Sequence, residues 1–319
     1  MRTIPATSRR TPSRRYRRGF TLAEVLISMT IGMVVLASAT AFSLNSWKTR
    51  RSWTVREGVD RGARFVGLSI ARDVQEAGIA MVGTNVFSAL GSAGDTVSVL
   101  SVPFEPQEAP VYPIFDDGDT LPNYPPGGTC GATCIDFRKV GGTYALNAGD
   151  LVRLQVGTTR RLLLLTSVAN RSSTLFRIQF LPATRLVNRD AGLDSLLLSR
   201  SGTTIQRLNV VMYWRNAATK ELMRAQRLKS TGGPDGDVMA TGVEAFTSKL
   251  VFLSGAEHAT YDGLDADTTN DGNDVMGVRI RAKMKSDRSD PAVNGGNPVS
   301  RWYEWRVAPR NLLYEKNKM

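Results

Sequence analysis

An apolar segment near the N-terminus constrains the fold of this chain more than any other feature. The segment begins at Phe20, and from Val25 to Leu44 it contains no charged residue and no proline. As an α-helix, a run of ~20 such residues spans about 30 Å, which is the hydrocarbon thickness of a bilayer. The sequence therefore predicts one helix that can cross a membrane.

The residues before this segment are strongly basic. Of the 41 lysines and arginines of the chain, seven arginines lie in residues 1–19, which contain no acidic residue. The positive-inside rule keeps such a leader in the cytoplasm and sends the chain after Leu44 outward. Most of the protein is therefore predicted to be extracytoplasmic, and beyond the leader it is only mildly basic.

Three interpretations of the apolar segment differ in how they treat its single carboxylate, Glu24. An uncleaved signal anchor would tether a soluble domain. A secretory signal peptide would be cut at the small-residue patterns of residues 37–41, although its apolar core is longer than the usual length of about 7–15 residues. In the third interpretation, cleavage between Gly19 and Phe20 creates an α-amine that neutralises Glu24 of a neighbouring helix. A partner is needed because an unpaired carboxylate in hydrocarbon costs several kcal/mol.

One stretch resembles the class III signal of type IV prepilins and type II secretion pseudopilins: Arg18-Gly19-Phe20-Thr21-Leu22-Ala23-Glu24-Val25-Leu26-Ile27. The resemblance implies that Gly19 is the last leader residue, Phe20 the first mature and N-methylated residue, and Glu24 the assembly carboxylate. It also implies four partners: prepilin peptidase, the inner-membrane assembly machinery, other minor and major pilins, and lipid before assembly. The chain would span the inner membrane once before it joins a surface pilus or a periplasmic pseudopilus.

After Leu44 the pattern becomes that of a helix with one apolar face. Apolar residues recur every three or four positions: Val59, Ala63, Val66, Ile70, Val74 and Ala77. With Gly78 as stop, one helix is predicted over residues 20–78, apolar all round over 20–44 and amphipathic over 45–78. Two tryptophans are typical of an interfacial anchor: Trp47 and Trp53.

From residue 79 onward the periodicity changes from 3.6 to 2, which predicts β-strands. The strand candidates lie at residues 96–102, 151–156, 162–168, 175–181, 208–214, 243–252, 278–284 and 302–307. Residues 213–215 and 222–225 are predicted to form a hairpin. The predicted fold class is α+β and similar to pilins, with the long N-terminal helix packed on a mainly antiparallel β head formed by residues 79–319.

Residues 103–133 contain half of the 14 prolines of the chain. This density is incompatible with central strands, so a long surface loop rich in proline and glycine is predicted. The two cysteines of the sequence, Cys130 and Cys134, lie at its end. Outside the membrane they are expected to form a small structural disulfide.

An acidic stretch at residues 262–274 offers oxygen ligands of the kind that Ca²⁺ prefers. Asp267, Thr269 and Asp271 imitate the start of an EF-hand loop, and Asp265 lies just before them. The imitation is incomplete, because no glutamate closes the shell at the expected position and no helices flank the stretch. Two interpretations stay open: a calcium site formed by these four residues, and a solvated polar turn.

Two shorter stretches resemble minor pilins of the PilW type. They are Ala71-Arg72-Asp73-Val74-Gln75-Glu76-Ala77-Gly78 and Val307-Ala308-Pro309-Arg310-Asn311-Leu312. In the first, the alanines fit the packed side of the helix, whereas Arg72 and Asp73 are expected to stay solvated or to pair with the head. The apolar segment also lacks the helix-kinking proline of major pilins, with Ala41 about where one is expected, which favours a minor component.

No enzyme is predicted, because the sequence contains no nucleotide-binding, metalloprotease or serine-hydrolase motif and one histidine, His258. The function that the resemblance implies is a minor pilin that primes or joins a type IV pilus through helix docking. A type II secretion pseudopilin would use the same helix.

A fibre-tip binding protein, either an adhesin or a DNA-uptake protein, is the alternative from another class. In that case the loop 103–133 or one basic strand face would contact a surface or DNA. The basic face is formed by Arg279, Arg281, Lys283 and Lys285. A solvated sheet face is the plain explanation of the same pattern.

Overall fold

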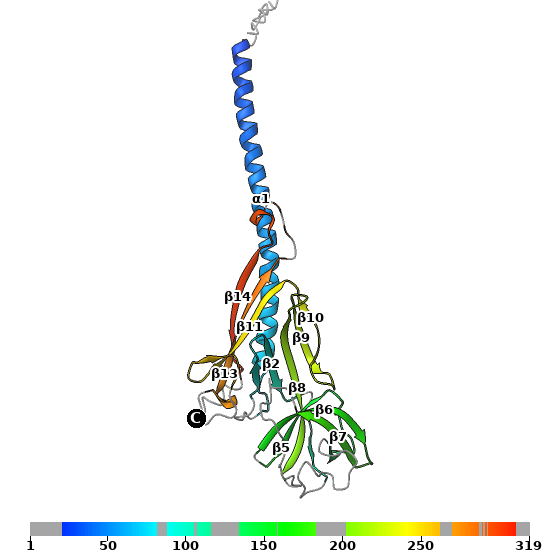
Figure 1. Cartoon of the computed structure of the whole chain (residues 1–319). Helices are drawn as coiled ribbons and strands as arrows, with labels where there is room; N and C mark the ends of the chain where they lie inside the picture. The colour runs from blue at the N-terminus through cyan, green and yellow to red at the C-terminus, as the bar shows by residue number, and fades with distance from the viewer. Residues whose placement is uncertain are drawn as a thin grey trace, which may run out of the picture. The chain divides into compact units, whose positions relative to one another are not determined.

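The structure, a computed structural model, describes residues 21–81, 88–104, 107–115, 134–157, 159–182, 202–261, 270–286, 289, 291 and 293–310. Two units are each compact in themselves, Met1–Trp53 and Thr54–Met319. Helix α1, Leu22–Gln75, contributes residues to both units (Figure 1).

In the first unit, α1 is exposed and apolar. Every side chain from residue 21 to residue 45 is exposed. An 18-residue window of α1 has a mean hydropathy of 2.1, so the helix is long and apolar enough to cross a membrane by length and composition. A helix that is apolar all round needs lipid or other helices around it, because water is a poor solvent for such a surface.

In the second unit, the apolar stripe of α1 is buried, as its spacing predicts. The buried residues of the stripe are Val59, Ala63, Val66, Ile70 and Val74. The helix ends at Gln75, and Gly78 follows with a φ of 77°, a left-handed conformation that suits glycine. The Gly78 N–H donates to the Leu100 carbonyl at 2.9 Å, so the chain leaves the helix directly toward a strand.

Ten strands of the described part form one antiparallel sheet, with the main order β1-β2-β8-β5-β6-β7-β4. These strands are β1 (Leu90–Ser92), β2 (Thr96–Ser101), β4 (Cys134–Arg138), β5 (Leu151–Val156), β6 (Thr159–Asn170), β7 (Leu175–Pro182) and β8 (Thr203–Asn216). Three more lie off this path: β3 (Val111–Pro113) and β9 (Glu221–Leu228) pair with β8, and β10 (Pro234–Ala240) pairs with β9.

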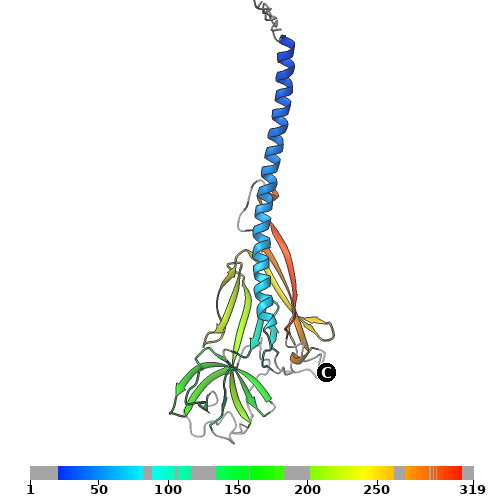
Figure 2. The ribbon, with the colours of Figure 1, turned by 180° about the vertical axis from the view of Figure 1, so that it is seen from behind.

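A second antiparallel sheet in the described part has the order β12-β11-β13-β14. Its strands are β11 (Val243–Phe252), β12 (Glu257–His258), β13 (Val275–Lys285) and β14 (Ser300–Val307). Figures 1 and 2 show that the part of α1 in this unit lies between the β13–β14 side and the β9–β10 side. The α+β fold class, one long N-terminal helix packed on antiparallel sheets, is thereby confirmed.

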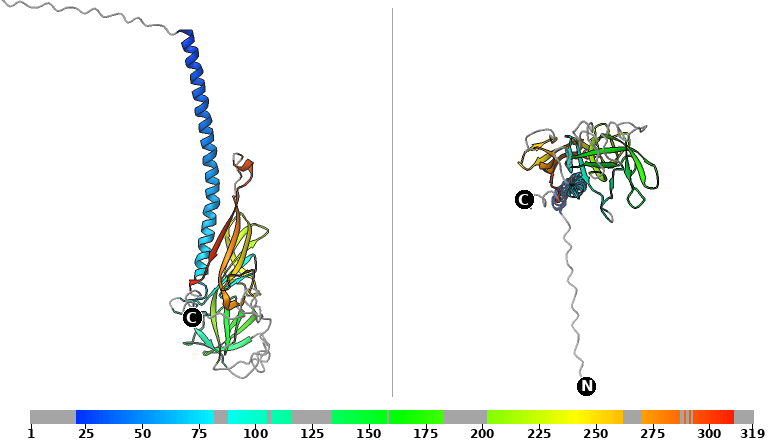
Figure 3. Two further views of the ribbon diagram at one scale, coloured as in Figure 1. Left: turned by 90° about the vertical axis from the view of Figure 1, so that its left-hand side faces the viewer. Right: turned by 90° about the horizontal axis from the view of Figure 1, so that it is seen from below.

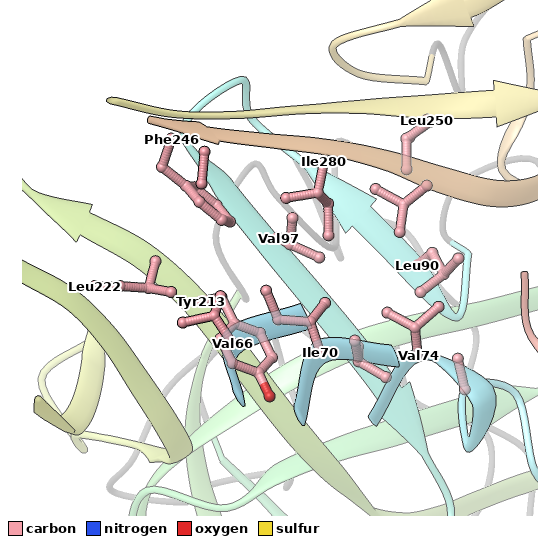
Figure 4. Close-up of a cluster of buried hydrophobic side chains, with 14 of the residues drawn as sticks. Val66, Ile70, Val74, Leu90, Val97, Tyr213, Leu222, Phe246, Leu250 and Ile280 are labelled. Carbon is pink, nitrogen blue, oxygen red and sulfur yellow. The ribbon is translucent and has the colours of Figure 1, made fainter. Parts of the chain in front are cut away.

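The largest core cluster joins the helix to both sheets. Val66, Ile70 and Val74 of α1 face strand residues in Figure 4, and the labelled strand residues are Leu90, Val97, Tyr213, Leu222, Phe246, Leu250 and Ile280. Each fully buried aliphatic side chain of this size contributes about 1.5–3 kcal/mol. The stripe predicted from the sequence therefore fixes this part of α1 to the strands.

Several strand predictions are confirmed and one range is corrected. The bounds of β5 and β11 agree with the predicted ranges, and the predicted hairpin is the β8–β9 pair. The range 103–133 is not one loop, because β3 lies inside it and pairs with β8. Its prolines allow this strand because Pro110 precedes it and Pro113 ends it. Residues 116–133 lie outside the described residues.

Candidate functional site

Reciprocal hydrogen bonds between Thr21 and Glu24 close the N-terminus of α1. The Thr21 backbone N–H donates to Glu24 Oε2 at 3.1 Å, and the Glu24 backbone N–H donates to Thr21 Oγ1 at 3.3 Å. This arrangement is a capping box, in which side chains satisfy backbone donors at the helix end. Thr21 is not among the residues predicted for the site. The signal that identifies it is a threonine three residues before a glutamate at the start of an apolar run.

The carboxylate of Glu24 is surrounded by exposed apolar side chains. Leu22, Val25 and Leu26 are 82%, 52% and 56% exposed. The Thr21 hydroxyl donates to Glu24 Oε2 at 3.2 Å, which supplies a further donor but no positive charge. When lipid or helices cover this surface, the carboxylate loses its water, and a cation beside it then becomes strongly favourable.

Gly19 and Phe20, the predicted processing residues, lie outside the described residues. Their roles therefore stay predictions. Trp47 and Trp53, the predicted interfacial anchors, are exposed, and the Arg51 guanidinium carbon lies 5.6 Å from the centre of the Trp47 ring. Aromatic rings beside a cation are common at membrane surfaces, which agrees with the anchoring prediction but does not test it.

A buried carboxylate connects α1 to the ten-stranded sheet. Asp73 is 8% exposed, and its Oδ2 accepts from Arg224 Nη2 of β9 at 2.8 Å and from the Tyr213 hydroxyl of β8. Arg224 Nε also donates to the Tyr213 oxygen at 3.0 Å. Burial, together with the hydrogen bond to Asp73, raises the pKa of Tyr213 well above its ordinary value. Of the two outcomes expected for Asp73, solvation or pairing with the head, the structure has pairing.

A second carboxylate connects α1 to the four-stranded sheet. Asp60 accepts from the Tyr303 hydroxyl of β14, and Arg301 Nη1 donates to the same carboxylate at 3.4 Å. Burial and this hydrogen bond raise the pKa of Tyr303 to about 12. The helix is thus bonded to both sheets through acidic residues on two of its sides.

Helix and strand approach most closely at Gly67. A Cβ atom at this position would lie 2.2 Å from Nε1 of Trp305 on β14, a distance that no real side chain tolerates. Glycine is therefore required here for contact rather than for backbone freedom. The indole of Trp305 fills the space that a side chain would otherwise take.

The two stretches that resemble PilW-type minor pilins meet in the structure. Arg310 Nη2 donates to Gln75 Oε1 at 3.1 Å, which joins the end of α1 to the chain just after β14. Arg72, in the same stretch as Gln75, stays at the surface and lies 3.7 Å from Glu76.

The basic strand face of β13 is paired with glutamates. Arg279 contacts Glu257 and Glu304 at 2.8 Å each. Arg281 lies 3.5 Å from Glu304, and the two lysines of the face, Lys283 and Lys285, lie 2.8 and 3.4 Å from Glu244. Each of the four side chains therefore has a carboxylate beside it, which lowers the attraction of this face for a polyanion.

Most of the predicted calcium ligands lie outside the described residues, namely Asp265, Asp267 and Thr269. Asp271 is described and is 1% exposed. No group of three His, Cys, Asp or Glu side chains suited to a metal occurs among the residues that the structure describes. The calcium site stays a prediction, and calorimetric titration of the full chain with Ca²⁺ tests it, since absence of heat would contradict it.

The predicted disulfide is supported at one of its two cysteines, because Cys134 is disulfide-bonded. Cys134 begins β4 and is fully buried, whereas Cys130 lies outside the described residues. The surroundings of Cys134 are those of a structural rather than a reactive cysteine, because a buried sulfur is inaccessible to solvent.

Comparison with known proteins gives one match. Residues 14–40 match the family described as the prokaryotic N-terminal methylation motif. No curated protein and no solved structure matches the chain. The matched residues cover the predicted cleavage site, the capping box and most of the apolar segment. The chain is thus prepilin-like at its N-terminus, and proteins with this signal are structural subunits rather than enzymes.

Proposed function

We propose that this protein is a minor pilin, of the PilW type, that primes or joins a type IV pilus. Prepilin peptidase cleaves it between Gly19 and Phe20, and the N-terminal helix then docks among the helices of neighbouring subunits. The observation that carries the proposal is an exposed apolar helix that bears one carboxylate, Glu24, in its first turn. The methylation motif over residues 14–40 supports it.

The geometry suggests how docking works. Before assembly, lipid covers the apolar residues 25–44, because their exposed surface needs an apolar environment. Transfer into a bundle of helices replaces lipid by side chains at little hydrophobic gain, so polar contacts decide the register. Glu24 supplies such a contact, since the methylated α-amine of a neighbouring Phe20 neutralises it. Thr21 holds the carboxylate in place at the helix start.

A minor rather than a major subunit is supported by two features. The apolar segment contains no proline, and the two stretches that resemble the PilW type contact each other through Gln75 and Arg310. A type II secretion pseudopilin is the close alternative, because it would use the same helix. Co-purification with one machine or the other separates them. The glutamates beside the β13 basic face give no support to DNA binding.

The first experiment is the N-terminal sequence and intact mass of the protein isolated from its native membrane or fibre. We expect a chain that begins at Phe20 and is heavier by one methyl group. A start at Thr40 or Phe42 would make it a secreted soluble protein. An intact Met1 would leave a membrane-anchored domain and contradict processing.

A second experiment separates the two roles of Glu24. Glutamine can also serve in a capping box but has no charge, so Glu24→Gln keeps the cap and removes the carboxylate. If charge sets the register, both Glu24→Gln and Glu24→Ala insert in the membrane but do not enter the fibre. Recovery of incorporation by Glu24→Gln would assign Glu24 to helix capping alone. The matched control is Glu57→Gln, because Glu57 forms an exposed ion pair with Arg61 on the same helix.

A further inference from the structure

Strand β14 is an exposed edge that contains neither a bulge nor a proline. It is the last strand of the four-stranded sheet, and Figure 3 shows β13 on one side of it and no strand on the other. It pairs with β13 from Ser300 to Val307 without a register shift. Its sequence is rich in residues that favour strands, namely Trp302, Tyr303, Trp305 and Val307.

The backbone groups of alternate β14 residues point away from β13. The Val299 carbonyl accepts from the Ser286 N–H at 2.8 Å, and the Val299 N–H donates to Ser286 Oγ at 3.0 Å, so Val299 faces β13. In an antiparallel pair the facing alternates. Trp302, Glu304 and Arg306 therefore direct their N–H and C=O groups outward, and within the described residues these groups have no hydrogen bond.

Two other edges in the described part are protected. β10 begins with Pro234, contains Gly236 and two aspartates, and shifts register twice against β9. β12, at the opposite edge of the same sheet as β14, is two residues long. Proline, charge, bulges and short length are the devices that prevent unwanted strand pairing. β14 carries Arg301, Glu304 and Arg306, but it is eight residues long and has neither bulge nor proline, so a second strand fits it.

We propose that β14 accepts an extended strand from a different subunit of the same fibre, an inference that rests on the proposed function. Antiparallel pairing with a second copy is disfavoured by direction. The contacts Arg301 to Asp60, Trp305 to Gly67 and Arg310 to Gln75 show that β14 runs the same way as α1. Antiparallel pairing of two β14 strands would point the parts of α1 in the two second units, residues 54–75, in opposite directions, so the two subunits could not lie the same way round in one fibre.

The side chains of β14 indicate the chemistry of the added strand. On the outer face, Trp302 is 47% exposed and stacks with Arg281, whose guanidinium carbon lies 5.0 Å from the ring centre. Arg306 lies on the same face, beyond Glu304, is 65% exposed, and shares Glu304 with Arg279 and Arg281. Because basic side chains outnumber the carboxylates around Glu304, the partner strand is expected to present an acidic residue on this face and backbone groups to the edge.

Amide hydrogen exchange of the full chain, resolved by residue, tests this pairing. In the purified, detergent-solubilised chain, the amides of Trp302, Glu304 and Arg306 should exchange fast, whereas those of Tyr303 and Trp305 are protected by β13. In isolated fibres, the three outward amides should slow on the order of 100-fold. Fast exchange of these amides in fibres that contain the chain would overturn the pairing.

Two further outcomes are decisive. Protection that rises with the concentration of the purified chain would identify a second copy as the occupant and overturn our proposal. Absence of the processed chain from fibres would overturn both this proposal and the minor-pilin function, whereas presence with unprotected amides overturns the pairing alone.

A matched pair of variants tests the same edge genetically. Trp302→Pro removes an outward N–H and leaves the β13 ladder intact, and Trp302→Ala removes the same side chain without the backbone change. We expect incorporation into fibres to fall at least about tenfold in Trp302→Pro relative to Trp302→Ala, with equal melting temperatures. Equal incorporation of the two folded variants would contradict the pairing, and if Trp302→Pro does not fold, the exchange experiment decides.

Discussion

Among single residues, Asp73 bears most directly on the stability of the second unit. Its carboxylate is 8% exposed and bonded to Arg224 and Tyr213. Removing one partner of a buried pair leaves the other charge without compensation. Breaking a fully buried ion pair in this way costs about 3–5 kcal/mol. Because Arg224 is 29% exposed and keeps part of its water, we expect Asp73→Ala to lower the free energy of unfolding by less, about 2–3 kcal/mol. Thermal unfolding of the full chain in detergent measures this.

Arg72 provides the neighbouring control. Its side chain is 81% exposed and lies 3.7 Å from Glu76. Exposed pairs of this kind contribute about 0–1 kcal/mol. A loss in Arg72→Ala as large as that in Asp73→Ala would mean that the burial of Asp73 is not the cause.

Tyr303, whose hydroxyl donates to Asp60, makes stability depend on pH in the alkaline range. Burial and the Asp60 hydrogen bond raise the pKa of Tyr303 to about 12, above the ordinary value of about 10. The folded chain keeps this proton where the unfolded chain loses it, so the contribution is complete below about pH 10 and declines as pH rises toward 12. The unfolding midpoint should therefore fall less steeply between pH 9 and 11.5 in Tyr303→Phe. Parallel curves for the two proteins would contradict this.

At the scale of elements, the approach of α1 to β14 depends on Gly67. A methyl group there would lie within 2.2 Å of the Trp305 indole, so one of the two elements must move. We expect Gly67→Ala to destabilise the chain by about 1–3 kcal/mol. Thermal unfolding with Gly58→Ala as control checks this, because nothing lies within 4 Å of a Cβ at Gly58.

Gly58→Ala has the opposite expected sign. With open space around the added methyl, the gain in helix propensity should stabilise the chain by up to about 1 kcal/mol. Similar losses in both variants would attribute the effect to glycine flexibility rather than to the contact with Trp305.

Strands with a clear apolar pattern could be predicted from the sequence, whereas β4 and β10 could not. β5 and β11 are rich in apolar residues and were predicted with the observed bounds. β4 is buried on both faces, so it shows no alternation, and β10 begins with proline and contains glycine, which are turn signals. Tertiary pairing decides such strands, because local preference for them is weak.

The residues of the candidate site also fall into two groups, those that the sequence predicts and those that it does not. Glu24 and the processing residues belong to a local motif, and the sequence of that motif is sufficient to find them. Asp73, Tyr213 and Arg224 are far apart in the sequence, and no local pattern predicts that they meet. The stripe on α1 indicated which side of the helix is buried, but the strands that cover it depend on the whole topology.

At the scale of the whole molecule, processing should not release the protein. The exposed residues 21–45, which contain the apolar run 25–44, follow the predicted cleavage site and stay in the mature chain. We expect the mature protein to remain in the membrane fraction after washes with high salt and alkaline carbonate, and to dissolve in detergent. Release of the chain by carbonate would contradict an anchoring helix and favour cleavage after the apolar segment.

The parallel course of α1 and β14 has a mechanical consequence. The helix is fastened to β14 at Asp60 and Gly67 and to Arg310, just after β14, at Gln75, at successive levels along a common direction. A pull along the helix loads these three contacts in shear and at the same time, whereas a pull across it would peel them apart one by one. A subunit held by its helix in a fibre under tension should therefore keep its strands attached up to a high force and then yield in a single step.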